Sequence, residues 1–135
     1  VLSSLEGLPL DITLHETTSG IAAVLDGGRP GPTVLLRGDM DALPMPEDTD
    51  LEFESRTDNV MHACGHDTHT SMLVSAAKLL SAHRDEIAGR VLFMFQPGEE
   101  GYAGARFSRP RTWKTSVTSG RAKSGNVRGR PRPTV

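Results

Sequence analysis

Side chains that bind metal ions are concentrated between residues 62 and 69 of this 135-residue chain. This short run holds three histidines, one cysteine and one aspartate, which are His62, Cys64, His66, Asp67 and His69. In an extended segment, residues two positions apart project to the same side, so Cys64 and His66 can reach one ion, and Gly65 relaxes the backbone between them. A thiolate and an imidazole suit divalent ions such as Zn²⁺, Co²⁺ or Mn²⁺. The alternative is a histidine-rich turn that only caps a helix.

Two adjacent carboxylates, Glu99 and Glu100, follow the apolar run 91–95. Like charges side by side cost free energy unless a positive charge compensates them, and a bound cation is the natural candidate. Because neighbouring residues point in different directions, one carboxylate can bind the metal while the other holds a water beside it. A metal-assisted hydrolase needs this combination of Lewis acid and general base. The alternative is a solvated acidic loop.

A second acidic pair, Asp39 and Asp41, follows the apolar run 33–37. In open α/β folds, binding sites lie at the carboxyl ends of the strands. We therefore expect the segments around residues 39–41, 62–69 and 99–100 to converge at one edge of a sheet. A turn with aspartate–backbone hydrogen bonds is the alternative for this pair.

The elements that must position these groups follow an α/β pattern. Alternating or continuous apolar residues predict four strands, at residues 10–14, 21–25, 33–37 and 91–95. The continuous apolar run at 91–95 is typical of a strand covered on both faces. We expect an α/β fold with a mostly parallel sheet flanked by helices. If later strands of that sheet are lacking, residues 91–95 would lie at an exposed edge.

The segments between these strands carry their own signals. An apolar face of helical spacing predicts a helix over residues 69–83, with Thr68 or Thr70 as its cap. Asp26-Gly27-Gly28 is typical of a hairpin turn, and the acidic, proline-containing residues 44–60 predict a long loop.

Charge divides the chain into two unlike parts. Residues 1–105 contain 6 basic and 17 acidic residues, a net charge of −11, whereas residues 106–135 contain 9 basic residues and no acid. The basic part lacks apolar periodicity, so we expect disorder there, and we favour a tail without a selected role over a nucleic-acid-binding arm. No apolar run is long enough to span a membrane, no secretory pattern is present, and a single cysteine excludes an internal disulfide framework. We expect a cytoplasmic protein.

Three ordered segments resemble the M20 metallopeptidase family. They read LRGDMDALP at 36–44, MHACGHDTH at 61–69 and VLFMFQPGEEG at 91–101. The nearest branch contains hippurate hydrolase, N-acyl-amino-acid amidohydrolases and plant auxin-conjugate hydrolases. The resemblance implies a metal-dependent amidohydrolase that cleaves the amide bond of small N-acyl amino acids, with two divalent ions per complete site. Manganese or zinc is expected, and cobalt or nickel are alternatives.

The same resemblance implies roles for individual residues. Cys64, His66 and Glu100 would be metal ligands. Glu99 would be the general base for the attacking water, and Asp41 would orient the site. His62 and His69 would have supporting roles, while Asp67 and Asp39 align with ligands of more distant relatives and are not assigned as ligands here.

The chain departs from this family after about residue 107. Members are much longer, carry two further histidine ligands downstream and an added lid domain, and often form homo-oligomers, whereas no histidine follows His83 here. The resemblance therefore implies that residues 1–106 are the N-terminal part of a metallohydrolase catalytic domain, a partial zinc-peptidase-like fold. We expect residues 107–135 to be a basic tail produced by truncation and a reading-frame change.

Three other functions remain open at this point. An inactive fragment would keep only a remnant metal site. A nucleic-acid-binding protein would use the basic tail and show steep salt dependence. A thiol hydrolase would use Cys64 as nucleophile with His66 or His69 as base, and would not respond to chelators.

Overall fold

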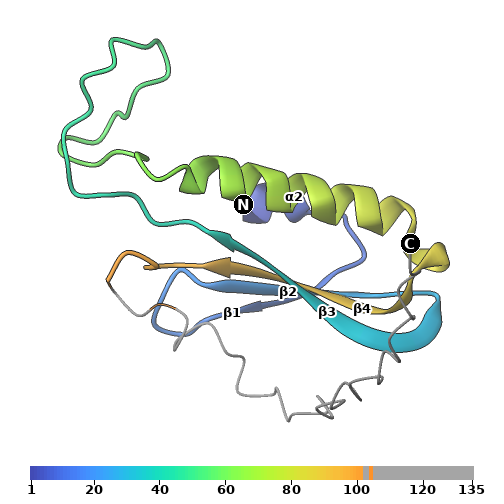
Figure 1. Cartoon of the computed structure of the whole chain (residues 1–135). Coiled ribbons are helices and arrows are strands. Elements are labelled where there is room, and N and C mark those ends of the chain that lie inside the picture. Colours follow the sequence, from blue (N-terminus) through green and yellow to red (C-terminus); the bar gives the residue numbers. More distant parts are fainter. Residues whose placement is uncertain (102–103, 105–135) are drawn as a thin grey trace, which may run out of the picture.

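A computed structural model describes residues 1–101 and residue 104, so the predicted basic segment 107–135 lies outside the described residues. Four strands form one sheet, with a long helix lying across one face and a short helix on the same side (Figure 1). In chain order the elements are α1 (Leu2–Leu5), β1 (Asp11–Leu14), β2 (Ile21–Asp26), β3 (Arg29–Asp39), α2 (His66–Ala82), the 3₁₀ turn η1 (Arg84–Glu86) and β4 (Ala88–Gln96).

The sheet is mixed, with the strand order β1-β2-β4-β3. Only β3 and β4 pair in parallel, and β2 pairs antiparallel with both β1 and β4. The predicted α/β class is confirmed, but the prediction of a mostly parallel sheet is wrong for the described strands. The physical reason is the short connection 15–20 between β1 and β2, which permits only antiparallel pairing, whereas α2 supplies the long crossover that a parallel pair needs.

Strand β4 lies inside the sheet, between β2 and β3. Phe93 and Phe95 are completely buried, as expected for a strand covered on both faces. The expectation that residues 91–95 form an exposed edge is therefore wrong, and the described edges are β1 and β3. The predicted hairpin turn at Gly27 and Gly28 does not join neighbouring strands, because β4 lies between β2 and β3. The Gly27 N–H donates to the Gly89 carbonyl within β4, and the Gly28 N–H donates to the Arg84 carbonyl in η1.

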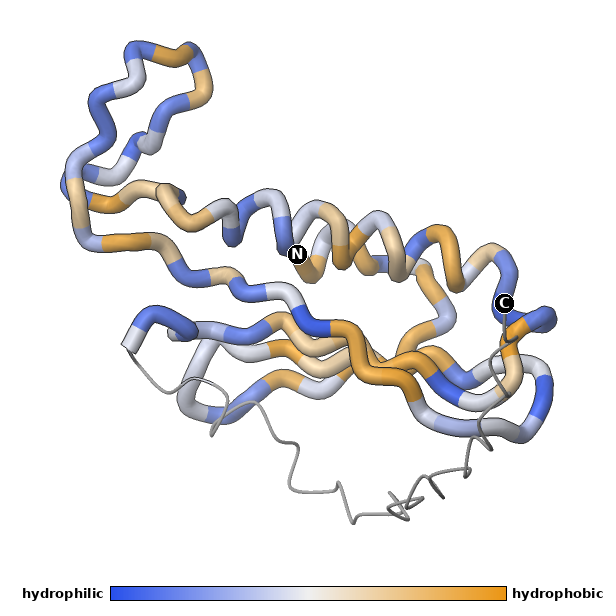
Figure 2. Tube along the Cα trace, in the orientation of Figure 1, coloured by the Kyte–Doolittle hydropathy of each residue, from blue (hydrophilic) through white to orange (hydrophobic). Residues whose placement is uncertain are grey.

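The core lies between the sheet and the two helices. Alternate residues of β2 and β4 meet one face of α2, and the buried set is Leu5, Ile21, Ala23, Leu25, Leu73, Ala77, Val91, Phe93 and Phe95. Figure 2 shows these strands and the inner side of the helix in the hydrophobic colour. A Cβ at Gly38 would lie 3.1 Å from the His69 carbonyl oxygen and from Leu73, so the missing side chain lets α2 sit close to β3.

Helix α2 begins at His66, three residues before the predicted start. Its N-cap is Gly65, which has φ +77° and no side-chain cap, so the prediction of Thr68 or Thr70 as cap is wrong. Thr68 instead donates to the Gly65 carbonyl at 2.6 Å, and Thr70 donates to the Asp39 carbonyl at 3.0 Å. The second bond fastens the first turn of α2 to the end of β3.

The predicted loop at residues 44–60 is confirmed, because no helix or strand occurs there. It projects away from the sheet and helix (Figure 1) and is closed at its base by an antiparallel bridge between Leu43 and Met61. Among the described residues, no helix has the length and apolar character needed to cross a membrane.

Candidate metal centre

The parallel pair β3–β4 brings two of the candidate segments together. Asp39 lies in register with Gln96, and the Met40 N–H donates to the Gln96 carbonyl at 2.9 Å. Both strands therefore finish at the same edge of the sheet, as expected. The chain beyond β3 supplies Asp41 and the chain beyond β4 supplies Glu100, while α2 begins beside them.

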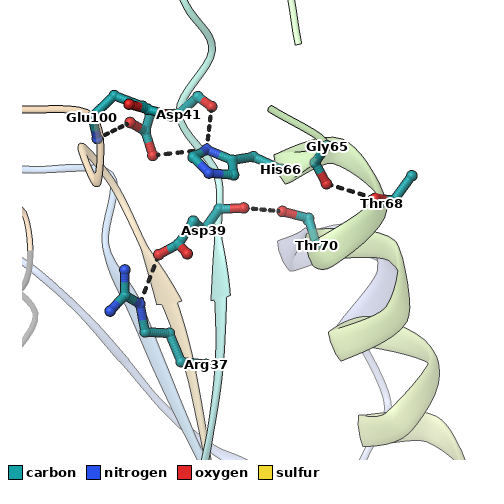
Figure 3. Close-up of polar contacts among 8 residues, drawn as sticks. All are labelled: Arg37, Asp39, Asp41, Gly65, His66, Thr68, Thr70 and Glu100. Carbon is teal, nitrogen blue, oxygen red and sulfur yellow. Dashed lines mark hydrogen bonds and ion pairs between the residues drawn. The ribbon is translucent and has the colours of Figure 1, made fainter. Parts of the chain in front are cut away.

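His66 is held in one orientation by Asp41. Its Nδ1 lies 2.8 Å from the Asp41 carbonyl oxygen and 3.3 Å from the Asp41 Oδ1, and the residue is only 2% exposed (Figure 3). A carbonyl oxygen only accepts hydrogen bonds, so Nδ1 carries the proton and donates. In the neutral ring the lone pair is then on Nε2, which is the form of imidazole that binds a metal.

The carboxylate of Asp41 joins the other two segments. Its Oδ2 accepts the Glu100 backbone N–H at 2.9 Å (Figure 3), and its buried Oδ1 has no hydrogen bond, with only the longer ion-pair contact to His66. Burial raises the pKa of Asp41, but N–H groups of Glu100, Glu99 and Asp41 itself, together with His66, outweigh burial and lower the pKa below its ordinary 3.8. Asp41 is therefore an anion at neutral pH that anchors both His66 and the Glu100 backbone.

Cys64, His66 and Glu100 form a candidate ligand group. One sulfur, one nitrogen and one carboxylate oxygen from these residues all lie within 4.8 Å of one another. Donor atoms within this limit can reach one ion at the usual metal–ligand bond length of about 2.0–2.3 Å, and the three donor types are those of zinc and related ions. The donor set therefore fits a divalent metal ion.

The exposed thiol of Cys64 responds to the negative charge around it. A hydrogen bond to the Glu100 carboxylate raises the pKa of the thiol above 9.0, and burial and the charges of Glu100, Glu99 and Asp41 act in the same direction. A thiol in these surroundings is a poor nucleophile at neutral pH. A cation placed among the same groups would reverse the effect, because a thiolate that binds a metal is deprotonated.

A second group combines Asp39, His66 and His69, whose ligand atoms also lie within 4.8 Å of one another. The His66 and His69 ring centroids are 5.5 Å apart, and Asp39 Oδ1 accepts a hydrogen bond from Arg37 Nε at 2.7 Å. The two groups share His66, whose Nδ1 is already bonded to Asp41, so a single free nitrogen serves one group at a time. The sequence analysis missed this group, although the spacing of His66 and His69, nearly one helical turn, was a usable signal.

The remaining candidates lie outside these two groups. Within the described part of the chain, neither group contains His62, Asp67 or Glu99. Glu99 is exposed and adjoins the ligand candidate Glu100.

Comparisons with known proteins identify relatives for the same part of the chain. The family described as peptidase family M20/M25/M40 matches residues 35–114. Thermostable carboxypeptidase 1 of Saccharolobus solfataricus is 51% identical over 90 residues, which are 65% of this chain and 23% of that protein. N-acetylcysteine deacetylase of Bacillus subtilis is 49% identical over 95 residues, 70% of this chain and 25% of that protein.

Solved structures give the same result. The YXEP protein of Bacillus subtilis, described as a dinuclear metal-binding peptidase of the M20 family, is 43% identical with a TM-score of 0.73, over 78% of this chain and 30% of that one. A protein from methicillin-resistant Staphylococcus aureus has a TM-score of 0.75 and 38% identity, over 79% of this chain and 29% of that one. The chain thus spans about a quarter of the length of the curated relatives it matches. Because the family matches more than half of its residues, the chain belongs to the M20 peptidase family.

Proposed function

We propose that this chain supplies part of the active site of a metal-dependent amidohydrolase that cleaves the amide bond of N-acyl amino acids. The observation that carries the proposal is the gathering of Cys64 and His66 from one segment with Glu100 from another, and Glu99 directly precedes Glu100 in the chain. Relatives named as an N-acetylcysteine deacetylase and as an N-acyl-L-amino acid amidohydrolase support this substrate class.

In this proposal Cys64, His66 and Glu100 hold the metal. When bound, a divalent ion acidifies a water molecule and polarises the scissile carbonyl. Glu99 takes a proton from the attacking water and returns it to the leaving amine, which is the usual exchange of roles for a general acid–base. Asp41 keeps His66 in the tautomer with a free Nε2 and holds the Glu100 backbone.

The complete site holds two divalent ions, manganese or zinc, in our proposal. The YXEP protein, described as dinuclear, supports the count of two. The Cys64–His66–Glu100 group and the Asp39–His66–His69 group share His66, so the described residues can hold one ion at a time. Further ligands then come from the part of the family's fold that this chain does not span.

The decisive test separates metal binding from the proton transfer. The chain, alone and co-expressed with the remainder of the Bacillus subtilis deacetylase, is assayed for release of free amino acid from N-acetyl and N-benzoyl amino acids with Mn²⁺ or Zn²⁺. Glu99→Gln should bind metal as the parent does and lose about 10²–10⁴-fold in hydrolysis. Cys64→Ser and Glu100→Gln should weaken metal binding itself. Metal binding insensitive to both substitutions contradicts the site assignment.

The same assay distinguishes the other functions. A thiol hydrolase would keep its activity with chelator and lose it on alkylation of Cys64, which the raised pKa of this thiol disfavours. Metal binding without turnover, with or without the remainder of the relative, would identify a remnant metal site. Residues 107–135, for which we favour a tail without a selected role over a nucleic-acid-binding arm, lie outside those described.

A further inference from the structure

The end of β3 and the first turn of α2 place three donor side chains around one point. Asp39, His66 and His69 each offer one ligand atom, and these three atoms lie within 4.8 Å of one another. His66 and His69 are three positions apart on α2, so their rings lie on one side of the helix, with centroids 5.5 Å apart. Asp39 is the last residue of β3. The set therefore joins a strand to a helix, and such elements hold side chains more precisely than loops do.

Two backbone features fix the distance between the strand and the helix. The Thr70 hydroxyl donates to the Asp39 carbonyl oxygen at 3.0 Å, which fastens the first turn of α2 to the end of β3 (Figure 3). Directly before Asp39, a Cβ at Gly38 would lie 3.1 Å from the His69 carbonyl oxygen, so the glycine permits this close approach. Backbone packing thus brings the three donors together.

Each of the three side chains keeps an atom that can bind an ion. His66 Nδ1 donates to the Asp41 carbonyl oxygen at 2.8 Å, which leaves the lone pair of the neutral ring on Nε2. Arg37 Nε donates to Asp39 Oδ1 at 2.7 Å, and the second oxygen of that carboxylate can still act as a ligand. His69 is exposed, and a neutral imidazole always carries a lone pair on one ring nitrogen.

We propose that Asp39, His66 and His69 form a second metal site, which takes a divalent ion that prefers nitrogen and oxygen donors, such as Ni²⁺. Two imidazoles and one carboxylate are a recurrent ligand set for divalent transition metals and leave positions open for water. This set contains no sulfur, whereas the thiol of Cys64 gives the Cys64–His66–Glu100 group its preference for zinc. Because both sets need Nε2 of His66, an ion in one set excludes an ion from the other.

The charges around the second site favour moderate affinity. The Arg37 guanidinium opposes a cation, but its side chain is 40% exposed, so water and salt screen its charge. The Asp41 carboxylate, with Oδ1 at 3.3 Å from His66 Nδ1, acts in the opposite direction and makes the ring a stronger ligand. We therefore expect measurable Ni²⁺ binding without help from a thiolate.

Nickel titration of the Cys64→Ser chain, prepared without a histidine tag, tests the site. This variant lacks the sulfur ligand and keeps all three donors of the proposed set, and titration calorimetry gives the affinity and the number of ions bound. We expect one Ni²⁺ per chain. Asp39→Asn or His69→Gln, added to this variant, should lower the Ni²⁺ affinity by at least about tenfold. His62→Gln, which replaces an exposed histidine of the same segment, should leave the affinity unchanged.

Two controls separate this site from the first group and from a folding defect. Glu100→Gln, added to Cys64→Ser, should leave the Ni²⁺ affinity unchanged, because Glu100 belongs only to the other set. The variants at Asp39 and His69 should melt within a few degrees of the parent chain, because His69 is exposed and asparagine preserves the size of aspartate.

The proposal is overturned if the Cys64→Ser chain binds no Ni²⁺, or if its Ni²⁺ affinity does not respond to Asp39→Asn and His69→Gln. It is also overturned if Glu100→Gln weakens binding as much as His69→Gln does, since the ion would then lie in the first group. With Zn²⁺ and Ni²⁺ supplied together, the parent chain should hold one ion, and two ions at once would contradict the shared nitrogen of His66. None of these measurements uses a substrate, so their outcome is independent of the hydrolytic function proposed above.

Discussion

The two ends of the parallel pair β3–β4 are built from different residues. Where the strands begin, a hollow of about 650 Å³ is lined mostly by glycine, proline and charged residues of the segment 26–33, with Gly89 and Arg90. Where the strands finish, the side chains are a thiol, two imidazoles and several carboxylates. At the first end Arg90 and Asp26 already pair with each other, whereas at the second end donors from three segments point toward one another.

The convergence of donor side chains, and not the size of a hollow, therefore identifies the candidate site. Glycines occur at both ends for different reasons. At Gly89 (φ +92°) a Cβ would overlap the Pro32 carbonyl oxygen, so this glycine permits close packing of the chain. At Gly65 (φ +77°) a Cβ would find space, so the need is the left-handed backbone between Cys64 and His66.

The strongest contrast between the two ends comes from Gly89→Ala. Because the new Cβ would overlap backbone and the φ value is unfavourable, we expect a loss of about 4 kcal/mol or more, enough to abolish folding of a small domain. Soluble yield and thermal unfolding by circular dichroism measure this. A variant that melts within a few degrees of the parent would show that the packing at this end is not as described.

The second largest effect is expected at the metal end. Cys64→Ser or Glu100→Gln replaces one of three grouped anionic or imidazole donors with a weak neutral one, so Zn²⁺ should bind about 100-fold more weakly or not at all, at or beyond the upper end of the effect for residues that only support a ligand. Titration calorimetry measures the affinity. Asp26→Asn, at the opposite end of the strands, is the matched control and should bind Zn²⁺ as the parent does. An equal loss of Zn²⁺ affinity in the control and in the ligand variants would contradict a metal site confined to the end where the strands finish.

A smaller effect on metal binding is expected from Asp41→Asn. The substitution preserves size but removes the anion that faces His66 Nδ1 and the Glu100 N–H, so Zn²⁺ affinity should fall about tenfold. The same titration measures the effect. Affinity unchanged from the parent would exclude a positioning role for this carboxylate.

Gly65→Ala is expected to cost less stability than Gly89→Ala. Since the backbone strain is the only penalty, we expect a loss of about 1–2 kcal/mol, well below that of Gly89→Ala. Urea unfolding measures the difference. If the two alanine variants lose equal stability, the distinction between packing and conformation fails.

The smallest expected effect is a difference in pH dependence. The pKa of Asp41 is lowered in the folded chain, so its contribution to stability is present above the ordinary value of 3.8 and is lost as the pH falls through the lowered value. Asp41→Asn should therefore lose less stability than the parent between pH 5 and pH 3, as measured by urea unfolding at both values. An equal or larger loss in the variant would contradict the direction of this shift.

Local sequence patterns predicted most strands and the long loop, but they did not predict which distant segments pair in the sheet. The runs 21–25, 33–37 and 91–95 are strands and residues 44–60 are a loop, because apolar periodicity and proline act locally. The position of β4 between β2 and β3 depends on hydrogen bonds between segments more than 50 residues apart, which no short pattern encodes. Placing Asp41 and Glu100 together required only that both follow parallel strands. The Asp39–His66–His69 group depends on the close approach of α2 at Gly38.

X-ray absorption at the zinc edge of the zinc-loaded chain reports directly whether Cys64 binds the ion together with His66 and Glu100. We expect one sulfur at about 2.3 Å together with nitrogen and oxygen neighbours at about 2.0–2.2 Å, and loss of the sulfur signal in Cys64→Ser. A coordination shell of nitrogen and oxygen alone in the parent chain would contradict the grouping of Cys64 with His66 and Glu100.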